Sequence, residues 1–188
     1  TPSKATDLQS LAGEYENVTI EELDVTDDGE IVSLAEKYTG KPIDILINNA
    51  GIPGDRTKQK LGNFDFAVFD QVMAVNVYGP LKMAQAFLNH VEASDQKKII
   101  TISSNGGSIG STQSARGLTY FYKSSKAALH MIMRSLSLEL KDRGVIVGLV
   151  SPGFVHTDFA GGVFIQGMIE PEESASAVIA VIDDYGME

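Results

Sequence analysis

Tyr122 and Lys126 are the residues of this chain whose types and spacing best suit proton-transfer chemistry. Four residues apart on a helix, two side chains lie on one face, a turn from each other. An ammonium beside a phenol favours the phenolate, so we expect Lys126 to lower the pKa of Tyr122 from its ordinary value near ~10. Such a tyrosine could act as a general acid or base, with a nearby serine hydroxyl bonded to the reacting oxygen.

The spacing alone does not identify a site, because Tyr/Lys pairs of this kind are usually exposed surface pairs. The chain contains a second pair, Tyr78 and Lys82, which brackets Gly79 and a proline that would kink or interrupt a helix. Tyr120 is a further rival to Tyr122, but no lysine follows it at this spacing. The elements around each tyrosine must therefore decide between them.

Short apolar runs alternate with amphipathic helical patterns along the chain, which indicates a parallel sheet covered by helices on both faces. We expect strands at 17–23, 43–47, 98–103 and 145–150. Helices are expected at 3–13, from Asp27 to about Gly40, at 64–90, at 120–142 and from Pro171 onward. Asp27 can cap the second of these helices, with Glu30 three residues later in a box-like arrangement. The predicted fold class is a doubly wound α/β domain without internal repeats or linkers.

Small or polar residues follow each predicted strand. They are Asp24, then Asn48 to Gly51, then Ser103-Ser104, then Pro152-Gly153. Ligands of such sheets bind beyond the carboxyl ends of the strands. Four strand ends of this character predict a binding site at that edge more strongly than any one motif does.

Composition narrows the classes of function. The 188 residues suit one domain, and a net charge of −10 argues against binding nucleic acid or anionic membranes. No apolar run approaches the ~20 residues of a membrane helix. The absence of cysteine excludes disulfides and thiolate chemistry and is compatible with a reducing cytosol. The three histidines have no metal-ligand spacing, so we expect no metal site.

These motifs together resemble the short-chain dehydrogenase/reductase family, most closely its C-factor and sniffer-type carbonyl reductases. The matches run in order along nearly the whole chain: Asp24-Val25, Asn48-Asn49-Ala50-Gly51, Asn76, Ser104, Tyr122 with Lys126, and Pro152 to Thr157. The long segment between Ser104 and Tyr122 and the phrase Ser124 to Leu129 favour the subgroup.

The resemblance implies a Rossmann-like oxidoreductase that interconverts a carbonyl and an alcohol. Tyr122 would donate the proton to a ketone or aldehyde oxygen, and Ser104 would polarise that carbonyl. Lys126 would lower the pKa of Tyr122 and bind the nicotinamide ribose. Asn76 would hold a water near Lys126.

The resemblance also implies a nicotinamide dinucleotide, NADP(H) rather than NAD(H). Asp24 and Val25 would face its adenine, and Asn49, Ala50 and Gly51 would line its path. Pro152 and Gly153, after the last strand, would also line the cofactor site, and Val155 and Thr157 would bind the nicotinamide carboxamide. The hydride comes from the cofactor.

Several residues have plainer interpretations. Asn48 and Asn49 could be turn residues, and Asp24 could simply begin a helix. Ser103 competes with Ser104, although only one of two adjacent strand residues points into a site. His156 and Asp158 fit loop structure, and Met131 with Met133 fits helix packing.

The family begins with a strand, a glycine-rich turn, a helix and a second strand, none of which is found here. We therefore expect a longer chain, on the order of 40 residues more in front and a further strand after Glu188. In the strand order 3-2-1-4-5-6, residues 18–23 would be third and 43–47 fourth, with the two strands between them absent.

Two other functions stay open: an idle dinucleotide-binding sensor and a sugar epimerase or dehydratase. We expect a homodimer or homotetramer through the helices at 64–90 and 120–142. The substrate pocket should be formed by loops at 52–63, 105–119 and 154–170, which carry few charges to set a substrate's polarity.

Overall fold

The structure, a computed structural model, describes residues 5–112, 119–160 and 164–186. Parts of three predicted segments lie outside these residues: 3–4 of the first helix, 113–118 of the long loop and 161–163 of the last loop.

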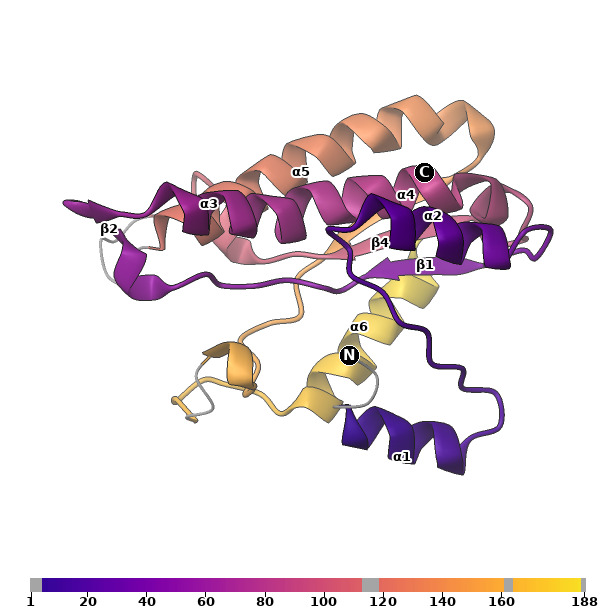
Figure 1. Ribbon diagram of the computed structural model, residues 1–188, viewed down its shortest axis with the longest axis horizontal. Coiled ribbons are helices and arrows are strands. Elements are labelled where there is room, and N and C mark those ends of the chain that lie inside the picture. The colour runs from indigo at the N-terminus through magenta and orange to yellow at the C-terminus, as the bar shows by residue number, and fades with distance from the viewer. Residues whose placement is uncertain (1–4, 113–118, 161–163, 187–188) are drawn as a thin grey trace.

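The centre of the molecule is a parallel β-sheet whose strands lie in the order β1-β4-β5 (Figure 1). The strands are β1 (Ile45–Asn48), β4 (Lys98–Ile102) and β5 (Ile146–Val150). Both pairings are parallel, as expected for strands joined through crossover helices. The predicted α/β fold class is confirmed.

Helices cover both faces of this sheet (Figure 1). On one face lie α2, α3, α4 and α5, and on the other lies α6. Their bounds are α2 (Asp28–Lys37), α3 (Phe66–Met73), α4 (Gly79–Glu92), α5 (Tyr120–Leu140) and α6 (Pro171–Asp184). Pro171 opens α6 as predicted.

Alternation along β4 builds a core on each face of the sheet. Ile99 packs with Val91 of α4 and Leu140 of α5, whereas Ile100 packs on the opposite face with Ile182 of α6. Both isoleucines are completely buried. Each contributes roughly 1.5–3 kcal/mol to stability. The helices therefore hold the strand ends in fixed positions.

The predicted helix cap at Asp27 is confirmed, but the predicted return bond from Glu30 to Asp27 is not formed. The Asp27 carboxylate accepts a hydrogen bond from the Glu30 N–H at 2.9 Å, which caps α2. Glu30 does not return to Asp27, since its Oε2 accepts from the Asp24 N–H at 2.6 Å. The box is therefore displaced by three residues and fixes the chain as it approaches α2.

The helical pattern at 64–90 is interrupted where Gly79 and Pro80 predicted. A π-helical turn, η3 (Ala74–Tyr78), joins α3 to α4, and the Gly79 N–H bonds the Ala74 carbonyl five residues back. Proline has no N–H to continue the regular ladder, which explains the wider turn. The turn places Asn76 in the interior, with no exposed surface.

The strand predicted at 17–23 is absent. Residues 18–24 have no strand hydrogen bonds, because no described strand lies beside them to accept and donate them. The helix predicted before them exists as α1 (Thr6–Glu14), but it buries no residue, and Leu8 and Leu11 stay exposed. Helix α1 thus lies outside the core, whereas Leu23 at the end of the next segment packs against the buried cluster of Ile31, Ala35, Met83 and Phe87.

The segment at 52–63, predicted as a loop, has short structure of its own. A 3₁₀ turn, η2 (Arg56–Lys58), leads into a small antiparallel hairpin of β2 (Gln59–Lys60) and β3 (Asn63–Phe64). Three further 3₁₀ turns follow the strands or helices: η4 (Asn105–Gly107), η5 (Lys141–Arg143) and η6 (Asp158–Ala160).

Candidate active site

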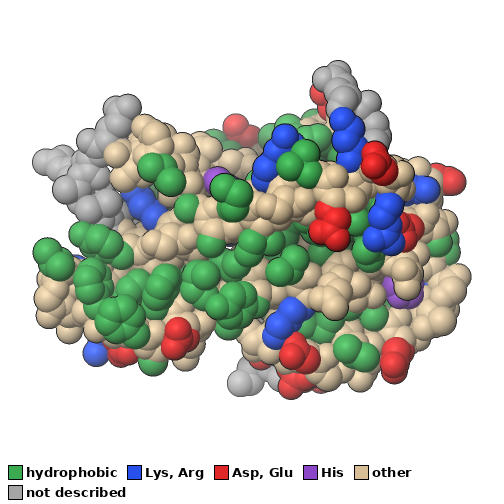
Figure 2. Space-filling model, turned by 90° about the horizontal axis from the view of Figure 1, so that it is seen from above, with side chains coloured by type: hydrophobic (Ala, Val, Ile, Leu, Met, Phe, Trp, Pro, Cys, Tyr) green, Lys and Arg blue, Asp and Glu red, His purple; other side chains and the backbone are tan. Residues whose placement is uncertain are grey.

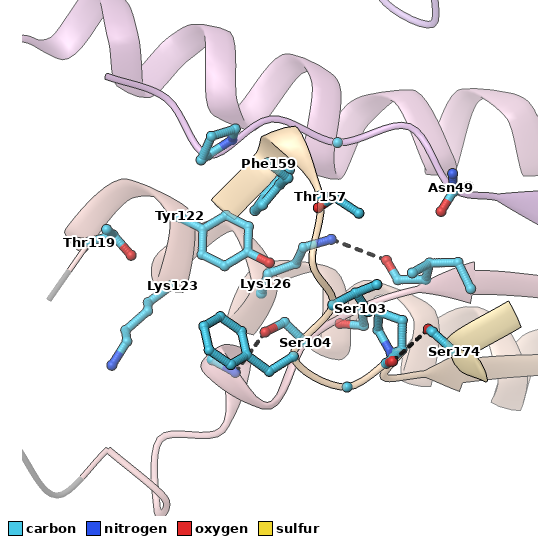
Figure 3. A pocket seen from close by; sticks show the side chains of 18 of the residues that line it. Asn49, Ser103, Ser104, Thr119, Tyr122, Lys123, Lys126, Thr157, Phe159 and Ser174 are labelled. Atoms are coloured by element: carbon cyan, nitrogen blue, oxygen red, sulfur yellow. Dashed lines mark hydrogen bonds between the residues drawn. The ribbon is translucent and has the colours of Figure 1, made fainter. Parts of the chain in front are cut away.

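A cavity of about 1390 Å³ opens at the carboxyl ends of the three strands. Asn49, after β1, lies at one end of the cavity and Thr119, before α5, lies at the other, with Tyr122 between them (Figure 3). Ser104, after β4, also lines it. The parallel sheet has thus brought together the strand ends that the sequence predicted would meet.

Tyr122 and Lys126 both face this cavity from the first two turns of α5 (Figure 3). The Lys126 side chain is buried, with its Nζ donating a hydrogen bond to the Ile102 carbonyl at 3.1 Å. The same nitrogen lies 5.8 Å from the centre of the Tyr122 ring. The ammonium is therefore beside the phenol but anchored to the end of β4.

The electrostatics of this pair differ from the prediction. Burial raises the pKa of Tyr122, and a hydrogen bond with the Ser104 hydroxyl lowers it only in part. Burial also lowers the pKa of Lys126, to about 8. The expected lowering of the Tyr122 pKa by Lys126 is thus wrong for the free protein, since the desolvation of both groups dominates.

The two adjacent serines have separate partners. Ser104 caps η4 by accepting from the Gly106 N–H at 3.0 Å, and it also bonds Tyr122. Ser103 is buried, and its Oγ lies 2.6 Å from His130 Nε2. The geometry therefore joins Ser104, and not Ser103, to the tyrosine hydroxyl.

Close packing at Gly107 holds the serine turn against α5. A Cβ at Gly107 would lie 2.7 Å from the carbonyl carbon of Lys126 and 2.6 Å from His130 Cε1. Only glycine allows η4 to approach the helix this closely. Ser104 consequently stays in register with Tyr122.

Asn76 lies near this site, but hydrogen bonds to protein groups occupy the side chain that was predicted to hold a water near Lys126. Its Nδ2 donates to the Ile52 carbonyl at 2.9 Å and to Ser125 Oγ at 3.0 Å, and its Oδ1 accepts from the Ile52 N–H at 2.8 Å. Both amide hydrogens are used. The side chain therefore fastens the segment after β1 to α5, and no amide hydrogen remains to donate to a water near Lys126.

Most of the residues predicted to hold a dinucleotide line the cavity: Asn49, Ala50, Gly51, Pro152, Gly153, Val155 and Thr157. Two of these are glycines, and Gly153 has a positive φ of 86° that favours glycine. A Cβ at Gly51 would still lie 4.0 Å from Lys126 Nζ, so space remains there. Small side chains beside a tyrosine and a lysine fit the flat ring and ribose of a nicotinamide nucleotide.

Asp24 and Val25 do not line this cavity. The Asp24 carboxylate is occupied by the Thr26 N–H and hydroxyl at 2.8 and 2.7 Å, and these bonds lower its pKa. Val25 packs against Gly79, where an added Cβ would meet Val25 Cγ2 at 3.0 Å. Asn48 also turns inward, with its amide 3.5 Å from Thr101 Oγ1.

Sequence reasoning missed Gln59, which ties the η2 segment to the start of α5. Its Oε1 accepts from the N–H groups of Phe121 and Tyr122 at 3.0 and 3.2 Å, and its Nε2 donates to the carbonyls of Pro53 and Asp55 at 2.8 and 3.3 Å. Gln59 has no exposed surface. No local pattern marks such a residue, because its partners lie far along the chain.

Two further residues of the site escaped prediction. Phe159 stands edge-on to the Tyr122 ring, with ring centres 5.5 Å apart (Figure 3). His130 bonds Ser103, and burial and Lys126 lower its pKa. His130 could have been found, since it follows Lys126 by one helical turn.

The predicted loops contribute only Arg56 and Lys60 as charged residues of the described pocket lining, and both are positive. The described lining residues include Arg56, Lys60, Lys123 and Lys126 but no Asp or Glu. In the described part of the chain, no group of three His, Cys, Asp or Glu could hold a metal ion. No helix there is long and apolar enough to cross a bilayer.

Comparison with known proteins adds a family match. Residues 2–166 match the family model described as short chain dehydrogenase. C-signal of Myxococcus xanthus is 33% identical over 147 residues, covering 78% of this chain and 84% of that protein.

Two solved structures are similar. The NADPH-bound carbonyl reductase from chicken fatty liver has a TM-score of 0.89 and 31% identity, covering 97% of this chain and 76% of the other. The carbonyl reductase Sniffer of D. melanogaster also has a TM-score of 0.89, with 99% of this chain and 78% of the other covered. At 24% identity, that likeness concerns the fold alone.

Proposed function

The chain belongs to the short-chain dehydrogenase family, and from that premise we propose that it interconverts a carbonyl compound and an alcohol with Tyr122 as the general acid and base. One observation carries this assignment. Tyr122 lies in the cavity at the strand ends, bonded to Ser104 and backed by the buried Lys126. A phenol in that setting can exchange a proton with a bound oxygen.

In the direction of reduction, Tyr122 acts as the acid. Its raised pKa keeps the hydroxyl protonated around neutral pH, so that a proton is available for the carbonyl oxygen. Ser104 orients the same oxygen by donating its hydroxyl hydrogen. Lys126, with its pKa of about 8, is largely charged at pH 7 and stabilises the phenolate that proton transfer leaves behind.

Asn49, Ala50, Gly51, Val155 and Thr157 are proposed to hold the cofactor, with Tyr122 and Lys126 at its reacting end. A nicotinamide dinucleotide supplies the hydride when it is bound. NADP(H) is favoured over NAD(H), since the chicken carbonyl reductase was solved with NADPH. Asp24 and Val25 remain candidates for the adenine end, outside the cavity of the described residues.

Reduction of simple aldehydes with NADPH tests this function. Tyr122→Phe should lower kcat by about 10²–10⁴-fold without weakening NADPH binding, because only the transferable proton is removed. NADPH consumption at 340 nm measures kcat, and quenching or enhancement of NADPH fluorescence measures binding.

Tyr78→Phe is the matched control. It belongs to the second Tyr/Lys pair, where Tyr78 is exposed and Lys82 forms an ion pair with Asp28 at 2.5 Å, and it should leave kcat unchanged. A wild-type protein that binds NADPH and reduces no aldehyde or ketone would instead support the idle sensor.

We further propose that the protein self-associates through the face formed by α3, α4 and α5. Large hydrophobic side chains gather on this face (Figure 2), and those that are more than one-third exposed are Phe66, Tyr78, Leu81, Tyr120, Met131 and Leu138. Exposed apolar side chains that gather on one face mark candidate interaction surfaces. Two-fold symmetric dimers are the commonest oligomers, so we propose that a second copy of this chain covers the face.

A further inference from the structure

The cavity has a charge that is opposite to that of the chain. The protein carries 25 acidic and 15 basic residues, yet the described residues that line the cavity include four cations and no carboxylate. Lys126 belongs to the reacting centre, and Lys123 extends away from Tyr122 (Figure 3). Arg56 and Lys60 remain to be explained.

Arg56 lines the same cavity as Tyr122 and contacts a residue that packs against Tyr122. Its Nη2 donates to the Phe159 carbonyl at 3.4 Å, and the Phe159 ring stands edge-on to Tyr122 with ring centres 5.5 Å apart. Gln59 fastens the carbonyls of the same segment to the start of α5 through its four hydrogen bonds. The backbone beside Arg56 is therefore tied to the start of α5, and its exposed side chain reaches the segment that carries Phe159.

The positive charge of Arg56 has no acidic partner among the described residues. No described carboxylate forms an ion pair with Arg56 or Lys60, although four other Lys and Arg side chains of the described residues have such partners. The adjacent Asp55 is occupied by the Thr57 N–H and hydroxyl at 2.8 and 2.7 Å. A guanidinium retains several N–H donors after one bond to a carbonyl.

We propose that Arg56 binds a carboxylate on the carbonyl substrate, so that the enzyme prefers carbonyl compounds that carry a negative charge. This inference rests on the proposed function and names its substrate class. A guanidinium fork matches a carboxylate in a bidentate geometry. Phe154 and Phe159, which also line the cavity, supply apolar contact for the carbon skeleton between carbonyl and carboxylate. Lys60 adds a second positive charge to the lining of the cavity.

A phosphate of the cofactor is the other anion that could meet Arg56. The contact of Arg56 with Phe159 argues for the substrate, because the Phe159 ring lies against Tyr122. Asn49, proposed for the cofactor, lies farther along the cavity from Tyr122 than Phe159 does (Figure 3). The two sources differ in which Michaelis constant an Arg56 variant would change.

Two aldehydes of nearly equal shape, 4-formylbenzoate and 4-formylbenzamide, test the proposal with NADPH as the reductant. The wild type should show a higher kcat/KM for the benzoate. Arg56→Gln should lower the ratio of benzoate to benzamide kcat/KM by about tenfold or more, the loss expected for a hydrogen bond to a charged group. High salt should reduce the wild-type preference, since it screens the charge.

Lys58→Gln is the matched control, because Lys58 lies in the same 3₁₀ turn, forms an ion pair with Asp65 at 3.8 Å and does not line the cavity. It should leave the ratio unchanged. An Arg56→Gln enzyme with the wild-type ratio overturns the proposal. So does a variant in which only the KM for NADPH rises, which would assign Arg56 to a cofactor phosphate.

If the protein oxidises NADPH with neither aldehyde, the proposed function is contradicted. A binding measurement then tests separately whether Arg56 binds a carboxylate. Saturation-transfer NMR with the NADPH-loaded protein should detect stronger binding of 4-formylbenzoate than of 4-formylbenzamide, lost in Arg56→Gln. Equal binding of the two compounds by the wild type would overturn the anion site.

Discussion

Lys126 shows how burial at a single residue sets the chemistry of the site. The side chain is only 6% exposed and its pKa is lowered to about 8, because the charged form loses hydration that one carbonyl hydrogen bond does not replace. A lysine held this way keeps its charge at pH 7 but destabilises the folded state. We interpret this as the cost of keeping a cation beside Tyr122.

Lys126→Met should therefore stabilise the protein at pH 7 while abolishing reduction. The unfolded lysine titrates near 10.5 and the folded one near 8, so the unfolded state binds more protons between these values and wild-type stability rises with pH there. The gain from the methionine should be about 1–3 kcal/mol at pH 7 and smaller at pH 9.5. Urea unfolding at both pH values measures it, and a gain that grows with pH would contradict the assignment.

At this scale, spacing and resemblance were enough to find Tyr122, Lys126 and Ser104 in one cavity, but not the direction of the pKa shifts. The sequence puts Lys126 one helical turn from Tyr122, and the attraction between an ammonium and a phenolate then predicts a lowered pKa for Tyr122. Burial depends on residues from β4 and the later loops, which local spacing cannot reveal. The prediction for the Tyr122 pKa was wrong for that reason.

At the scale of elements, the α5 N-terminus depends on a residue from another part of the chain. Thr119, at the N-cap position, makes no side-chain hydrogen bond to the helix. Gln59 supplies the acceptor instead, 62 and 63 residues away in sequence from its partners. The first turn of the helix, which carries Tyr122, is thereby tied to the η2 segment.

Gln59→Met, which keeps the length of the side chain, should lower the free energy of unfolding by about 2–4 kcal/mol, because it leaves several buried backbone groups without partners. It should also lower kcat for reduction more than it raises the KM for NADPH, since Tyr122 loses its fixed position. Thermal unfolding and steady-state kinetics measure the two effects. Asn63→Met, an exposed polar position in the same hairpin, is the comparison, and equal effects at both sites would contradict the role of Gln59.

Element prediction succeeded where a segment carries its own signal. The helices from Asp27, at 120–142 and from Pro171, and the strands at 43–47, 98–103 and 145–150, correspond to elements of the structure within a few residues. The segment at 17–23 has a strand-like sequence but no neighbouring strand among the described residues. The small hairpin of β2 and β3 was missed because each strand has only two residues.

For the molecule as a whole, the predicted fold class and family are both confirmed. The face of α3, α4 and α5 remains a proposed self-association surface, with Met131 68% and Leu138 58% exposed on α5 (Figure 2). These two residues are seven apart and share a helix face. Two large apolar side chains exposed on one helix face, beside those of α3 and α4, are the reason a partner surface is proposed.

The double substitution Met131→Glu with Leu138→Glu should convert a dimer or tetramer to monomers, because like charges would face each other across a two-fold axis. Sedimentation velocity gives the oligomeric state of the wild type and the variant. Val32→Glu on α2, which is also exposed, is the control. A wild type that sediments as a monomer at micromolar concentration would refute the surface.

Transfer of deuterium from cofactor to substrate tests the proposed oxidoreductase function most directly. The protein is incubated with an aldehyde and NADPH labelled with deuterium on either face of the nicotinamide C4, and mass spectrometry follows the alcohol. The wild type should yield an alcohol with one deuterium on the former carbonyl carbon from one face only, and Tyr122→Phe should yield almost none. A wild type that binds NADPH but forms no deuterated alcohol from any aldehyde or ketone would contradict the assignment of Tyr122 as an acid in carbonyl reduction.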